Sequence, residues 1–74
     1  MAKFYSTDSV IEATRVTKKE TISDGGLFME GEPGWWRIID GDAEFFFPHD
    51  EFISLFKPLD KEGKALVLMK FGEK

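Results

Sequence analysis

Hydrophobic and polar positions along the chain fall into short apolar or alternating runs separated by turn residues. The clearest pair of runs flanks Asp40-Gly41, a dipeptide that strongly indicates a two-residue hairpin turn. A type I′ turn at these residues places Ile39 opposite Asp42 and pairs the two runs as antiparallel strands. A turn shifted to Gly41-Asp42 sorts the side chains in the same way, so a β-hairpin is predicted in either case.

Alternation along the two strands divides the hairpin into two faces, because successive side chains point to opposite sides of a sheet. One face is wholly apolar and is predicted to meet the core: Trp36, Ile38, Ala43, Phe45 and Phe47. The other face is amphipathic: Trp35, Arg37, Ile39, Asp42, Glu44 and Phe46. A cross-strand ion pair between Arg37 and Glu44 is expected there. This second face is either a surface that meets a partner or a second core layer beneath the N-terminal segment or the last strand.

The pattern before the hairpin predicts further short strands. Val10–Thr17 is rich in β-branched residues, Leu27–Met29 is a brief apolar run, and Phe4-Tyr5 indicates a first strand or an anchored arm. Glycine, proline and charged residues predict loops and turns at 18–26, 30–34 and 59–63.

A short helix is predicted after the hairpin, at about residues 50–57. Asp50 is a suitable N-cap, and Pro58 stops the helix. One apolar stripe follows from the i, i+3, i+4 spacing of three residues: Phe52, Leu55 and Phe56.

Ala65–Phe71 is apolar on nearly both sides and lies between two glycines, so it is predicted as a strand. Such a strand is either central in a sheet or paired at a subunit interface. The predicted fold class is therefore α+β, with a small antiparallel sheet or half-open barrel of four to five strands and one short helix. The 74 residues are expected to form a single domain, 1–74.

Composition limits how so short a chain can be stabilised. A domain of this size buries only about 60% of its unfolded surface. Cysteine is absent, which excludes disulfides and thiolate metal sites, so the aromatic residues are expected to supply a tight core. No apolar run approaches the roughly 20 residues of a membrane span. These features predict a cytoplasmic protein without a membrane partner.

Charge is distributed unevenly along the sequence. Residues 20–56 contain nine acids and one base, Arg37, which gives −8, whereas the other residues contain five acids and nine bases, which gives +4. An acidic surface repels nucleic acid and attracts basic protein surfaces. Direct nucleic-acid binding is therefore not expected, although the carboxylates could also mimic nucleic-acid phosphates toward a basic protein. Ordinary solubilising charge is the simplest alternative.

Candidate reaction chemistry is sparse. His49 is the single histidine and lacks a serine in a nucleophile motif, so it is interpreted as a solvated residue at the helix start. Asp40 and Asp42 have the positions of turn residues and lack the further ligands of a calcium loop. The sequence predicts no enzyme, no catalytic residue, no metal site and no cofactor.

One resemblance emerges from the order of several motifs. Pro33-Gly34 followed by Trp36 and Ile38, then Glu44 among aromatics, then D-x-F-x-x-x-[YF]-x-P, resembles a group of small bacteriophage and prophage proteins. In this chain the last motif has four residues: Asp50, Phe52, Phe56 and Pro58. The resemblance covers about residues 10–59, including V-I-E-A at 10–13.

The chain departs from that group at several positions. Trp35 stands in place of an aspartate, Phe46 or Phe47 in place of a Tyr-Pro pair, and His49 in place of a proline. The shared motif consists of turn, strand and helix signals. The resemblance implies a phage origin and no enzymatic activity.

Together these observations predict a small phage-type accessory protein that binds and modulates, most simply by inhibition, a host or phage protein with a basic surface. The predicted contact residues are Trp35, Arg37, Asp40, Asp42, Glu44 and Phe46. One alternative is a structural or virion-related component that self-associates as a homo-oligomer through Ala65–Phe71. The other alternative is a nucleic-acid mimic that docks on a nucleic-acid-binding protein.

Overall fold

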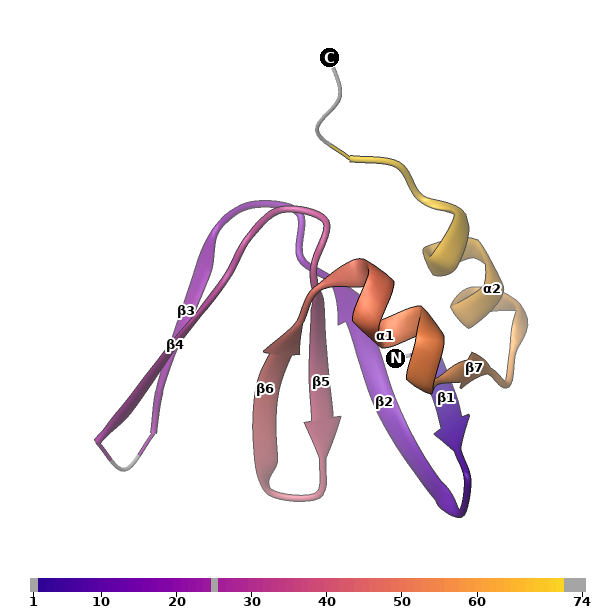
Figure 1. The fold of residues 1–74 in the computed structure, drawn as a ribbon, viewed down its shortest axis with the longest axis horizontal. Helices are drawn as coiled ribbons and strands as arrows, with labels where there is room; N and C mark the ends of the chain where they lie inside the picture. Colours follow the sequence, from indigo (N-terminus) through magenta and orange to yellow (C-terminus); the bar gives the residue numbers. More distant parts are fainter. Residues whose placement is uncertain (1, 25, 72–74) are drawn as a thin grey trace.

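The computed structural model describes residues 2–24 and 26–71, which form strands and helices in an α+β arrangement (Figure 1). The elements in chain order are β1 (Ala2–Ser6), β2 (Ser9–Arg15), β3 (Glu20–Asp24), β4 (Leu27–Gly31), β5 (Trp36–Asp40), β6 (Ala43–Phe47), α1 (His49–Leu55), β7 (Lys57–Pro58) and α2 (Lys61–Leu68). Five strands form one antiparallel sheet in the order β6-β5-β2-β1-β7, and β3 and β4 form a separate hairpin. The α+β class is confirmed, and the sheet does not close into a barrel.

The β5–β6 hairpin is present, with its turn one residue later than the first expectation. Asp40 pairs with Ala43, so the loop consists of Gly41 and Asp42. Gly41 has a φ of 64°, which suits the first central position of a type II′ turn. The shift preserves the two faces, because each side chain keeps its parity. Ala43 is nevertheless exposed, since it lies next to the hairpin tip.

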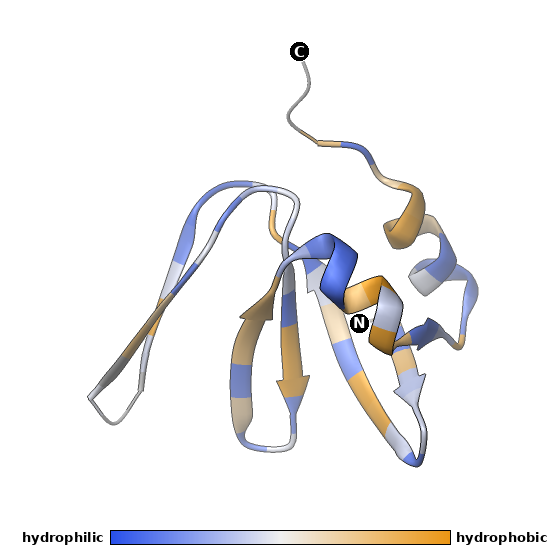
Figure 2. Cartoon of the chain, viewed as in Figure 1, coloured by the Kyte–Doolittle hydropathy of each residue, from blue (hydrophilic) through white to orange (hydrophobic). Residues whose placement is uncertain are grey.

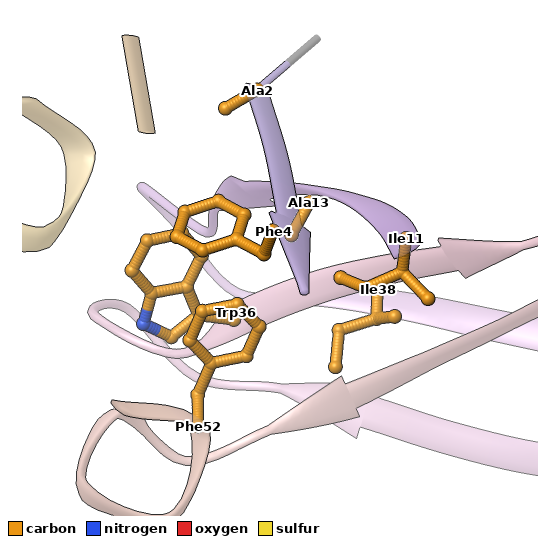
Figure 3. Close-up of a cluster of buried hydrophobic side chains, with 7 residues drawn as sticks. All are labelled: Ala2, Phe4, Ile11, Ala13, Trp36, Ile38 and Phe52. Atoms are coloured by element: carbon orange, nitrogen blue, oxygen red, sulfur yellow. The ribbon is translucent and has the colours of Figure 1, made fainter. Parts of the chain in front are cut away.

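The core is an aromatic cluster on one face of the five-stranded sheet, beneath α1 (Figure 3). The Trp36 ring stacks on Phe52 at 4.1 Å between centroids, and Phe4 meets both rings edge-on at 5.1 and 4.9 Å. Such contacts contribute about 0.5–1.5 kcal/mol per aromatic pair beyond burial. Figure 2 shows hydrophobic residues alternating with hydrophilic ones along β2, β5 and β6, with further hydrophobic stretches in α1, in the second half of α2 and along the β3–β4 hairpin.

The predicted helix at 50–57 exists but begins and ends earlier. α1 begins at His49, and its N-cap is Pro48, so Asp50 lies in the first turn instead of capping it. There its carboxylate still suits the positive end of the helix dipole. Leu55 is 51% exposed, which leaves Phe52 and Phe56 as the inward part of the apolar stripe.

Residues 57 and 58 leave the helix because the residue before a proline disfavours helical backbone. They form β7, in which Pro58 pairs with Phe4 and Lys57 with Tyr5. The edge of the sheet beside β1 is thereby occupied by a segment expected to be the end of a helix.

The strand predicted at Ala65–Phe71 is wrong, because residues up to Leu68 belong to α2. Asp60 caps this helix by accepting a hydrogen bond from the Gly63 N–H at 2.8 Å. Leu66 and Val67 pack against the core, whereas Leu68 is 75% exposed. Only one side of this apolar run is therefore buried. The prediction that copies of the chain pair as strands through this segment therefore loses its basis. The second helix was not predicted.

A second correction concerns residues 18–26, which were predicted as a polar loop. Glu20–Asp24 forms β3 and pairs with β4 along its whole length. The turn predicted at Asp24-Gly25-Gly26 includes Gly25, which lies outside the described residues. Figure 1 shows the β3–β4 hairpin, called here the arm, projecting beyond the five-stranded sheet on the β6 side.

Candidate functional site

The tip of the β5–β6 hairpin carries two exposed carboxylates. Asp40 ends β5, Asp42 completes the two-residue loop, and both are exposed. Gly41 between them has open space around its Cα. The two carboxylates of the predicted acidic tip are therefore open to solvent.

The root of the same hairpin is held by an ion-pair network centred on Arg37. Its Nη2 donates to Glu44 Oε2 at 3.0 Å, and its Nη1 lies 3.5 Å from Glu20 Oε1. The three side chains are each 36% exposed and join β5, β6 and β3. The expected Arg37–Glu44 pair is present, but diagonally, because Arg37 lies opposite Phe46. Two carboxylates share one guanidinium, so the network retains net negative charge.

Phe46 lies under the arm. It is half-buried, and a Cβ placed on Gly31 of β4 would come within 2.5 Å of its Cδ1. The second face of the hairpin is therefore a second core layer at Phe46. Its cover is the arm, whereas the expected covers were the N-terminal segment and the last strand.

Trp35 lies in different surroundings from the other predicted contact residues. It precedes β5, is half-buried, and its carbonyl accepts a hydrogen bond from the Val16 N–H at 2.9 Å. Its side chain lines an open groove of about 660 Å³ beside the end of α2 and the segment that follows it. Five of the six predicted contact residues thus lie on the β5–β6 hairpin, whereas Trp35 lies apart from them in the groove. The role of Trp35 as a contact stays a prediction.

Arg15, which sequence reasoning missed, lies at the base of this groove and is only 7% exposed. It donates hydrogen bonds to the carbonyls of Leu66 at 2.6 Å, Met69 at 3.3 Å and Gly34 at 2.7 Å. The guanidinium carbon lies 4.8 Å from the Trp36 ring centroid and 4.7 Å from that of Phe71. Desolvation lowers the pKa of Arg15, but a guanidinium remains charged at neutral pH.

The signal for Arg15 was present in the alternation of β2. Ile11 and Ala13 point inward, so Arg15, two residues further along, shares their side of the sheet. We name the group of Arg15 and its carbonyl and ring partners the Arg15 clasp. It joins β2 to the end of α2 and is a structural feature of the groove.

His49 is not the solvated residue that was expected. Its Nδ1 accepts a hydrogen bond from Trp36 Nε1 at 3.0 Å, and the two rings are nearly parallel. Burial lowers the pKa of His49, the nearby charge of Arg15 lowers it further, and Asp50 raises it in part. The neutral imidazole is therefore a partner of the core tryptophan.

Within residues 2–24 and 26–71, no group of three or more histidine, aspartate or glutamate side chains is arranged to hold a metal ion. In the same ranges, neither helix has the length and apolar character needed to cross a membrane. Comparisons with protein-family models, curated proteins and solved structures find no match for this chain.

Proposed function

We propose that this protein acts by binding, and that its acidic β5–β6 hairpin docks on a basic surface of a partner protein. The observation that carries this proposal is the exposed pair of carboxylates, Asp40 and Asp42, at the tip of a hairpin with a fixed root. The root is anchored on one side by buried Trp36 and Ile38 and on the other by the Arg37 network.

A fixed acidic tip is well suited to recognition of a basic surface. Complementary charge speeds the encounter of two proteins and selects partners. An anchored hairpin also loses less conformational freedom on docking than a mobile loop does. The geometry thus supports binding through the tip more directly than through Phe46, which the arm already covers.

The resemblance to small phage and prophage proteins supports a proposal for the kind of partner and for the place where it is met. The partner is then a host or phage protein met in the host cytoplasm, and docking modulates its activity, most simply by inhibition. Loss of charge at the hairpin tip should abolish this effect together with binding.

The test compares two variants that each remove two negative charges. Asp40→Asn/Asp42→Asn neutralises the tip, and Asp8→Asn/Glu62→Gln neutralises two exposed acids elsewhere. Each chain is immobilised and used to capture proteins from a host lysate at low and high salt. The wild type and the control pair should retain the same protein at low salt, whereas the tip variant should lose it. Equal capture by both variants would contradict the proposal.

A further inference from the structure

The outer edge of β6 carries main-chain hydrogen-bonding groups that the sheet does not use. β6 is the end strand of the five-stranded sheet and pairs only with β5 among the described strands. The two-residue loop makes Asp40 and Ala43 a hydrogen-bonded pair, and such pairs alternate along an antiparallel ladder. The N–H and C=O groups of Glu44 and Phe46 therefore point away from β5. Neither residue takes part in the backbone hydrogen bonds that join the described loops and turns.

This edge strand is short and carries one charged residue, Glu44, but it has no lysine, no proline and no bulge. Natural edges carry lysine, proline or a bulge, or are covered by another element. β6 contains none of these residue types, and its three phenylalanines are half-buried: Phe45, Phe46 and Phe47. Gly31 of the arm packs on the Phe46 ring, but β4 pairs with β3 and forms no ladder with β6.

Exposed acids lie beyond both ends of β6. Asp40 and Asp42 lie at the hairpin tip, while Asp50 and Glu51 lie in the first turn of α1, just after the strand. A basic extended segment would therefore meet opposite charge at each end. A second copy of this chain would instead bring the same acids, and like charges in close pairs destabilise a sheet.

We propose that the β6 edge accepts an extended, basic segment of the partner protein as an added antiparallel strand. The main chain of Glu44 and Phe46 supplies the hydrogen bonds, and the flanking acids select lysine or arginine in the added strand. This inference rests on the proposed function and specifies how the partner is held.

The probe is a short labelled peptide that alternates lysine and valine, with two comparison peptides. One replaces lysine by glutamate, and the other carries N-methyl groups on the amides that would join the ladder. Fluorescence anisotropy should show binding of the first peptide only. Equal binding of the N-methylated peptide, or no binding of the lysine peptide, would overturn strand addition.

A pair of variants at Glu44 tests the same edge from the protein side. Glu44→Pro and Glu44→Ala both remove the carboxylate that Arg37 binds, but only proline removes the outward N–H, and edge strands tolerate proline. Relative to Glu44→Ala, Glu44→Pro should weaken peptide binding about tenfold, the effect of one hydrogen bond near the top of the usual range. Equal affinities of the two variants would overturn the proposal.

Failure of strand addition is distinguishable from failure of the proposed function. If the two Glu44 variants capture the lysate protein equally and Asp40→Asn/Asp42→Asn still loses it, docking through the tip stands without strand addition. If the tip variant also retains that protein, both proposals fail. Sedimentation gives a further outcome, because a wild-type dimer that Glu44→Pro alone dissociates would assign the edge to a second copy and overturn the proposal.

Discussion

At the scale of single residues, Arg15 supplies the positive charge that the last turn of α2 lacks. The last turn of α2 contains no basic residue, yet the carbonyl end of a helix favours a cation. Arg15 provides it from β2 through its bonds to Leu66 and Met69. Its planar fork reaches three carbonyls at once while the two flanking rings cover its faces, which an ammonium group does not reproduce.

Arg15→Lys should therefore lower the free energy of unfolding by about 2–3 kcal/mol, the scale of lost hydrogen bonds to a charged group. Chemical denaturation measures this change. The matched control is Arg37→Lys, because Arg37 makes partly exposed ion pairs that are worth about 0.2–1 kcal/mol. Similar losses in the two variants would show that the Arg15 clasp contributes little.

His49 gives the protein a defined pH dependence. The pKa of His49 is lower in the folded state than its ordinary value of 6.5, so the unfolded chain binds the proton more tightly. The stabilising contribution is complete above pH 6.5 and is lost as the pH falls through the lower pKa of the folded state. Protonation also removes the acceptor for Trp36 Nε1.

The thermal midpoint should therefore fall between pH 7 and pH 5 more steeply in the wild type than in His49→Gln. Glutamine keeps a hydrogen-bond acceptor but does not titrate in this range. Parallel pH profiles of the two proteins would rule out His49 as the source of the slope.

At the scale of elements, the arm and the hairpin meet where one glycine allows close approach. Gly31 lies against Phe46, and a methyl group there would overlap the phenyl ring. Gly31→Ala should cost about 1–3 kcal/mol of stability, the usual effect of overpacking.

A double-mutant cycle tests this contact directly. If steric overlap is the cause, Gly31→Ala should cost much less in a Phe46→Ala background, measured by denaturation of the four proteins. An equal cost in both backgrounds would assign the effect to the strand backbone.

The elements that the sequence predicts well are those in which one face is strictly apolar. Trp36 and Ile38 fix the sorting of β5 whichever two-residue turn is chosen, because the side-chain period of a strand is two. β3 could not be found in this way, since it is polar and is stabilised by pairing with β4 instead of burial.

α2 was mispredicted for the opposite reason. Ala65 and Leu68 are apolar but remain exposed, so hydropathy alone suggested two buried faces. The decisive signal was Asp60, which caps α2. In the sequence this aspartate falls within residues 59–63, which were interpreted as a charged loop. The sequence also could not show that Phe46 is covered while other predicted contact residues are exposed. The position of the arm over Phe46 is a tertiary contact that no local pattern encodes.

At the scale of the whole molecule, the two faces of the five-stranded sheet are covered differently. α1 and α2 cover the face that holds the aromatic core, whereas on the other face the arm packs over Phe46 and contacts Arg37. Tyr5 and Val10, a cross-strand pair on β1 and β2, are 41% and 61% exposed. One face of the sheet is thus covered by the two helices, and the β6 edge is flanked by acids and has no second strand partner among the described residues. The docking proposal uses this arrangement.

The Arg15 clasp also sets the order in which a nascent chain can complete its structure. Arg15 is joined to carbonyls 51 and 54 residues later, and the Leu59 N–H donates to the Lys3 carbonyl at 2.9 Å. While the ribosome is still making α2, the Arg15 guanidinium has the Gly34 carbonyl as a partner but lacks the carbonyls of Leu66 and Met69. Completion of the Arg15 clasp therefore waits for the synthesis of α2 and the residues after it, and a ribosome stalled before α2 would leave Arg15 with one of its three carbonyl partners.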